Sequence, residues 1–65
     1  MYPEAMAAFQ QAVRLKPDFA DAHLGLGMTY LAMGQKNQAQ QVYRTLLRVD
    51  KEMAQELYEE INKSK

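Results

Sequence analysis

The sequence has 65 residues, of which 48% are hydrophobic and 25% charged, with eight basic and eight acidic residues, one histidine and no cysteine. This length holds one domain at most, disulfides are excluded, and the zero formal charge argues against nucleic-acid binding, which calls for a basic surface. A structural zinc site would need four Cys or His ligands, which one histidine and no cysteine do not supply. No apolar run approaches the roughly 18 residues that a membrane span needs, so no membrane-spanning helix is expected. The N-terminus shows no signal-peptide pattern, which favours the cytoplasm.

The first helix is predicted between Pro3 and Lys16. Proline suits the first turn of a helix, where its missing N–H leaves no hydrogen bond unmade. Apolar residues then recur at spacings of three and four, which is typical of an amphipathic helix. These residues are Ala5, Met6, Phe9, Ala12 and Val13. Pro17 ends the helix, because proline disfavours the helical conformation of the residue before it.

A second helix is predicted between Asp18 and Gly34. Asp18 is a candidate N-cap, and Asp21 places another carboxylate in the first turn, where the helix dipole favours negative charge. Gly34 is expected in the left-handed conformation that commonly ends a helix. The helix is apolar on nearly all sides, except for a weakly polar face formed by Asp21, Gly25 and Thr29. We therefore expect it to be buried all round.

Two further helices follow. Asn37 is a candidate N-cap of the third helix, with Gln40 in the reciprocal position of a capping box. The apolar residues of this helix are Ala39, Val42, Tyr43, Leu46, Leu47 and Val49. Asp50 is the candidate N-cap of the fourth helix, whose apolar stripe is Met53, Ala54, Leu57, Tyr58 and Ile61. Short connections make successive helices antiparallel neighbours, so the sequence predicts an all-α fold.

The sequence repeats at an offset of 34 residues, at which small residues align with small ones and aromatic residues with aromatic ones. The aligned pairs include Ala5 with Ala39, Phe9 with Tyr43, Val13 with Leu47 and Ala20 with Ala54. This period, with His23-x2-Leu26-Gly27-x2-Tyr30 followed by Ala39-x3-Tyr43, resembles the tetratricopeptide repeat. The sequence departs from the family pattern at His23 (usually Trp), Lys51 (usually Pro) and Glu60-Ile61 (usually Leu-Gly). The last helix is therefore interpreted as a solvating cap.

The resemblance implies a right-handed α-solenoid fragment of four helices in antiparallel helix-turn-helix pairs. It further implies one domain over 1–65, with the second helix of a preceding repeat at 1–19, one complete repeat at 20–53 and a C-terminal capping helix at 54–65. Gly27 and Ala39 are expected to let paired helices approach closely. The rings of Phe9, Tyr30 and Tyr43 are expected to fill the space between helix pairs.

The family binds peptides on its inner, concave face, so the resemblance also implies a set of partner-binding residues. Carried over by position, these are Asp21, Leu24, Met28, Leu31 and Ala32. One subclass of the family clamps the C-terminal carboxylate of heat-shock chaperones with Lys and Asn, and this chain has Leu24 and Met28 there. Chaperone tails are therefore not expected partners. The alternative interpretation is that Leu24, Met28 and Leu31 face the closing helix and belong to the core.

The predicted function is a non-catalytic scaffold that binds a peptide or an amphipathic helix of another protein, without a cofactor or metal. The alternative is a self-assembly element, because part of the stripe of Tyr2, Met6, Phe9 and Val13 lacks a partner helix. Homo-oligomers would then form by stacking or exchanging helices. A third hypothesis is an auxiliary segment of a larger complex.

Other polar residues are assigned structural roles. His23 occupies the Trp position of the repeat, so it is expected to pack and not to act as a ligand or base, and no catalytic or phosphate-binding motif is present. Charged residues form a basic strip (Arg44, Arg48, Lys51) and an acidic strip (Glu52, Glu56, Glu59, Glu60), both interpreted as solvated faces. The alternative is a complementary contact between copies or with a charged partner, which would weaken with salt. Glu59 and Lys63 are spaced to pair.

Overall fold

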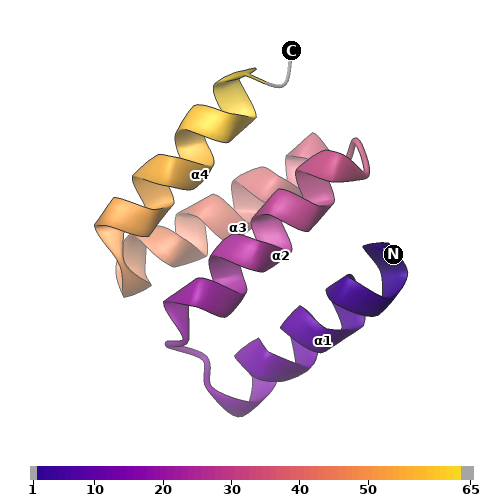
Figure 1. Cartoon of the computed structure of the whole chain (residues 1–65). Helices are drawn as coiled ribbons and strands as arrows, with labels where there is room; N and C mark the ends of the chain where they lie inside the picture. The colour runs from indigo at the N-terminus through magenta and orange to yellow at the C-terminus, as the bar shows by residue number, and fades with distance from the viewer. Residues whose placement is uncertain (1, 64–65) are drawn as a thin grey trace.

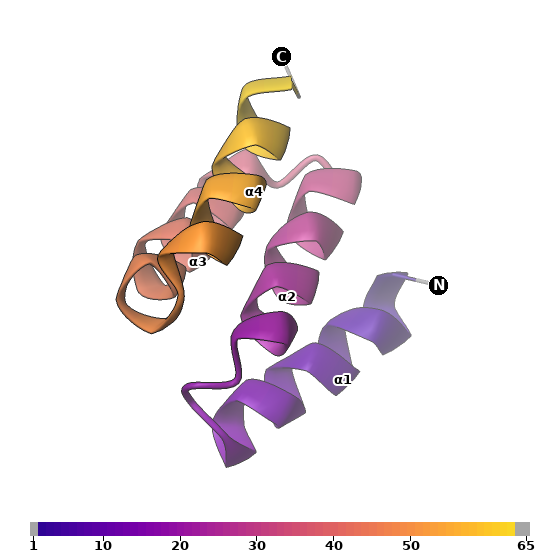
Figure 2. The same cartoon turned by 60° about the vertical axis from the view of Figure 1, so that its left-hand side comes forward.

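The computed structural model describes residues 2–63, which form four α-helices (Figure 1). The helices are α1 (Tyr2–Leu15), α2 (Ala20–Ala32), α3 (Lys36–Val49) and α4 (Lys51–Lys63). Helices α2, α3 and α4 contact one another in a triangle, whereas α1 packs on α2 alone among the described helices (Figure 2). The all-α prediction is confirmed, since residues 2–63 include no strand.

The connection between α1 and α2 differs from its prediction in one respect. Pro17 follows the end of α1 as expected, but Asp18 does not cap α2. Phe19 occupies the N-cap position in an extended conformation (φ −77°, ψ 93°), and no side chain completes the cap. The N-cap prediction for Asp18 was therefore wrong, because the extended residue comes one position later.

Gly34 ends α2 as predicted, with a positive φ of 76°. Its N–H donates to the carbonyl of Leu31 (3.0 Å), and the N–H of Gln35 donates to that of Tyr30 (2.8 Å). Because the chain turns so tightly, α3 begins at once, with Gln35 at its N-cap and no side-chain cap. Asn37 lies inside the first turn, so its predicted capping role was wrong.

Asp50 alone connects α3 to α4, and it caps α4 as predicted. Its Oδ1 accepts hydrogen bonds from the backbone N–H groups of Glu52 (3.0 Å) and Met53 (3.2 Å), which have no partner inside the helix. The capping helix was expected to begin at residue 54, after the complete repeat. That boundary lies inside α4, because the cap at Asp50 starts the helix at Lys51. The division of 1–65 into repeats stays a prediction.

The hydrophobic core lies within the triangle of α2, α3 and α4. Its buried members are Leu26, Ala39, Val42, Leu46, Ala54, Leu57 and Ile61. Leu46 and Leu57 are the largest side chains with no exposed surface. The predicted apolar stripes of the third and fourth helices thus supply most of the core, whereas α1 has no buried residue.

Two glycines of α2 mark where neighbouring helices approach most closely. A Cβ at Gly27 would lie 2.6 Å from Leu57 Cδ2 of α4, and one at Gly25 would overlap the ring of Phe9 of α1. Gly27 does mark a close approach, but of α4 and not of the paired helix α3 as predicted. Gly25 and Thr29 were predicted to form a weakly polar face with Asp21, but neither lies on an exposed face. Helix α1 covers Gly25, and Thr29 is buried, with its hydroxyl donating to the Gly25 carbonyl (2.8 Å).

The aromatic rings that were expected between helix pairs do pack against the core, but each remains partly exposed. Phe9, Tyr30 and Tyr43 are half-buried neighbours of the core cluster. On α1, Met6 and Val13 are also half-buried, and Tyr2 is 52% exposed. The stripe of α1 is therefore only partly covered, as predicted.

Helix α4 lacks the apolar face with which α2 packs on α1. Helix α2 meets α1 through Gly25, on the side of the buried Ala22 and Thr29. The positions 34 residues later are Glu56, Glu59 and Lys63, which are exposed. A charged face cannot replace an apolar one in a helix contact without a large desolvation cost. This difference supports the interpretation of α4 as a closing helix.

Candidate protein-binding surface

The contact between Gly27 and Leu57 defines which side of the α2–α4 pair is covered and which is open. Successive residues of an α-helix are about 100° apart, so the two neighbours of a contact residue lie on opposite sides of it. Leu26 is buried in the core, and Tyr58 stacks on Tyr43 of α3. Met28 and Glu56 therefore lie on the side that faces away from α3. We call this side the α2–α4 face.

Of the five predicted partner-binding residues, three are exposed. Asp21 and Ala32 are exposed, and Met28 is 37% exposed. Leu24 and Leu31 are half-buried and pack against the core, as the alternative interpretation expected of them. A binding surface at this position would therefore consist of Asp21, Met28 and Ala32 on α2, with the two leucines beneath them.

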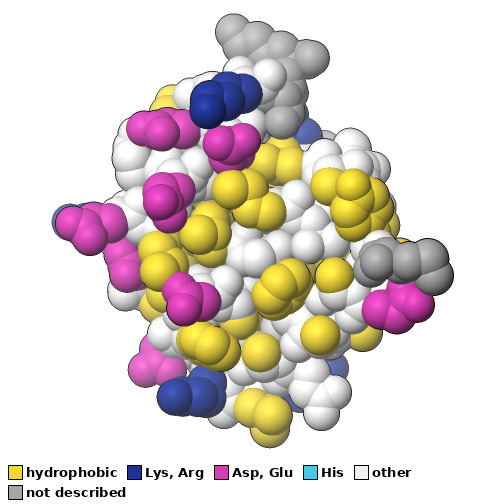
Figure 3. Space-filling view, viewed as in Figure 1, with side chains coloured by type: hydrophobic (Ala, Val, Ile, Leu, Met, Phe, Trp, Pro, Cys, Tyr) yellow, Lys and Arg dark blue, Asp and Glu magenta, His cyan; other side chains and the backbone are white. Residues whose placement is uncertain are grey.

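The α2–α4 face has an apolar centre and an acidic side. In Figure 3, hydrophobic side chains occupy the middle of the view, acidic side chains gather over α4, and Lys and Arg lie near the margins. Helix α4 supplies four acids: Glu52, Glu56, Glu59 and Glu60. Lys63 pairs with Glu60 (3.4 Å) and not with Glu59 as predicted, because the pair forms at a spacing of three residues.

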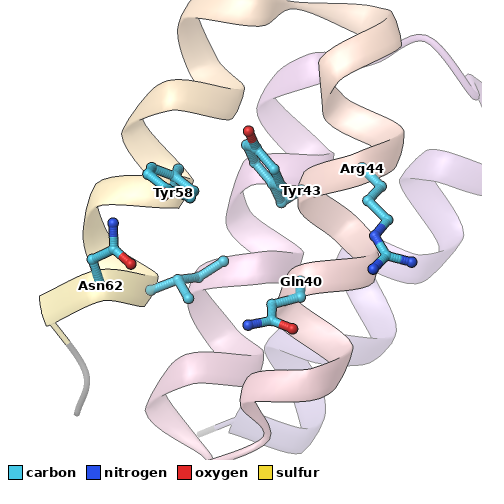
Figure 4. A pocket seen from close by; sticks show the side chains of 6 residues that line it. Gln40, Tyr43, Arg44, Tyr58 and Asn62 are labelled. Atoms are coloured by element: carbon cyan, nitrogen blue, oxygen red, sulfur yellow. The ribbon is translucent and has the colours of Figure 1, made fainter.

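A pocket of about 180 Å³ lies elsewhere, between α3 and α4 (Figure 4). Tyr43 and Tyr58 form one wall, with ring centroids 5.4 Å apart and planes inclined by 36°. The remaining lining residues are Gln40, Arg44, Ile61 and Asn62. Both tyrosines belong to the predicted apolar stripes, and this pocket was not predicted, although two aromatic residues beside amides on adjacent helices were a visible signal.

A second pocket of about 220 Å³ is lined by residues of α1, α2 and α3, which include Val13, His23 and Tyr30. His23 is 8% exposed, and its Nε2 donates to the carbonyl of Pro17 (2.7 Å). This hydrogen bond links the start of α2 to the preceding turn. This packing role is the one predicted for His23. Neither pocket includes any of the five predicted partner-binding residues.

The described residues carry few groups arranged for chemistry. Within residues 2–63, no group of three or more His, Asp or Glu side chains is placed to hold a metal ion. The hydroxyls of Thr29 and Thr45 donate to backbone carbonyls of their own helices. No helix in this range has the length and apolar character that crossing a membrane requires.

A family model described as tetratricopeptide repeat matches residues 1–61. No curated protein and no solved structure matches the chain.

Proposed function

The chain belongs to the tetratricopeptide repeat family, whose repeats are typically non-catalytic modules of protein–protein interaction, and we propose that it is a scaffold that holds a partner polypeptide on the α2–α4 face. The observation that carries the proposal is the exposure of Met28 between the exposed Asp21 and Ala32. Leu24 and Leu31 extend this apolar surface toward α4. A surface of this kind suits the apolar side of a helix or an extended peptide.

Methionine at the centre of the surface supports a role in binding. Its unbranched side chain repacks around differently shaped partners, and its thioether makes favourable contacts with aromatic rings. A partner that covers Met28 removes its exposed apolar area from water, which contributes about 25 cal/mol per Å² before the costs of association. Met28 is therefore the residue that a partner is expected to cover.

The test compares two methionines of nearly equal exposure, one inside α2 and one at its C-cap. Peptides selected for binding from a random library would be titrated against the chain and against Met28→Lys and Met33→Lys variants. Met33 is 38% exposed and follows the last turn of α2, beyond the proposed surface. Met28→Lys should weaken binding at least tenfold, because it places a charge in an apolar contact. Met33→Lys should leave it unchanged, and equal losses in both variants would refute the proposal.

A second candidate function is self-assembly, and exposed apolar side chains on three helices favour it. Leu15 at the end of α1 is 74% exposed, and Leu47 on α3 and Tyr58 on α4 are 39% and 43% exposed. If copies stack through these surfaces, the mass by light scattering should rise with concentration and fall in Leu15→Lys and Leu47→Lys variants. A monomer mass at every concentration excludes this candidate.

A further inference from the structure

The acidic residues of α4 are arranged along the proposed binding face. Glu52, Glu56 and Glu60 are spaced by four residues, so they follow one line along the helix. Glu56 lies on the side of Leu57 opposite Tyr58, and therefore on the α2–α4 face. Asp21 adds an exposed carboxylate in the first turn of α2. The apolar surface around Met28 is thus bordered by carboxylates.

Acidic residues outnumber basic ones at this border. Helix α2 contains no Lys or Arg. Helix α4 carries one lysine at each end. Lys51 lies seven residues before Tyr58 and so on the side of α3, whereas Lys63 lies seven residues after Glu56 and so at the border, where it pairs with Glu60. Arg44 and Arg48 are exposed on α3, from which the α2–α4 face points away. The border thus carries an excess of acidic residues, although the chain has zero formal charge.

We propose that the partner held on the α2–α4 face is a basic amphipathic helix. This inference rests on the proposed function and specifies its partner. The apolar side of such a helix covers Met28, Leu24 and Leu31, and its Lys and Arg side chains reach the carboxylates of Glu52 and Glu56. Complementary charge at the border of an apolar contact accelerates association and disfavours acidic partners.

Three synthetic peptides test the charge requirement directly. All three have the same leucine face, and their other face carries Lys, Gln or Glu at identical positions. The Lys peptide should bind at least tenfold more tightly than the Gln peptide at low salt, and the Glu peptide should bind most weakly. The advantage of the Lys peptide should shrink as salt is added, since exposed charges are screened beyond about 10 Å at 0.1 M salt.

Variants of the chain locate the carboxylates that are responsible. Glu52→Gln combined with Glu56→Gln should weaken binding of the Lys peptide about tenfold and leave the Gln peptide unaffected. The matched control is Gln10→Lys combined with Gln11→Lys, at exposed positions of α1. Both double variants shift the net charge by two positive units. An equal loss in the control would mean that net charge matters and position does not, which overturns the proposal.

The remaining outcomes separate this inference from the function on which it rests. If the Gln peptide binds as tightly as the Lys peptide and both depend on Met28, the charge requirement is refuted while the binding face stands. If no peptide binds, both proposals fail. Self-association that is lost in the Glu52→Gln and Glu56→Gln variant would assign the face to a second copy, through Arg44 and Arg48, and would also overturn the inference.

Discussion

Gly27 has no room for a side chain, because Leu57 occupies the space where a Cβ would lie. Leu57 has no exposed surface, so displacing its side chain would disturb its contacts in the core. Gly27→Val should therefore overpack the contact between α2 and α4 and lower the free energy of unfolding by about 1–3 kcal/mol. Urea denaturation measures the loss. The control is Ala32→Val, on the exposed side of the same helix, which should change stability by less than about 0.5 kcal/mol.

Asp50 and Asp18 have the same side chain before a helix, yet only Asp50 accepts capping hydrogen bonds. Asp50→Ala leaves the first N–H groups of α4 without their acceptor and should lower the free energy of unfolding by about 1 kcal/mol. Asp18→Ala should have almost no effect in the same thermal or urea unfolding experiment. A larger loss for Asp18→Ala would contradict the assigned N-cap of α2.

Local signals at single residues were predictive where the backbone conformation depends on one residue. Gly34 adopts the left-handed conformation that glycine alone adopts readily, and Asp50 is the single residue between two helices. The caps of α2 and α3 could not be predicted as well. Their helices begin after Phe19 and Gln35, which are poor capping residues, because the turns before them set the starting point.

Helix α1 depends on a single neighbour, α2, and contributes no buried residue to the core. Its amides should therefore exchange with deuterium faster than those of α3, through an opening that leaves the other three helices folded. Phe9→Ala should speed this exchange further, since the ring covers Gly25, and leave α3 protected. Equal protection of α1 and α3 would show that all four helices open together.

The helices were predictable as elements because their apolar residues recur with the period of an α-helix. Ala39, Val42 and Leu46 of α3 and Ala54, Leu57 and Ile61 of α4 follow that pattern and are buried. Which side of α2 is exposed was less predictable, because a helix that is apolar on nearly all sides shows no apolar stripe that would mark its buried side. Only the packing of α1 on Gly25 and of α4 on Gly27 leaves Met28 exposed.

As a whole, the molecule is thin, and this shape explains both its limited core and its large open surface. Its Cα atoms extend over 32 × 27 × 14 Å. The shortest dimension is only a little more than the 8–10 Å separation of two packed helices, so most helices keep a side in contact with water. The candidate surface followed partly from sequence, since Asp21, Met28 and Ala32 are exposed as a binding surface requires. The position of the acids beside them could not be predicted, because it depends on how α4 is rotated about its axis.

The central claim is that the α2–α4 face, and neither pocket, holds the partner. The most direct measurement is the change in backbone amide chemical shifts when a selected peptide is titrated into the labelled chain. We expect the largest changes at Asp21, Met28 and Ala32 of α2 and at Glu52 and Glu56 of α4. Changes confined to the tyrosine pocket, at Gln40, Tyr43 and Asn62, would contradict it.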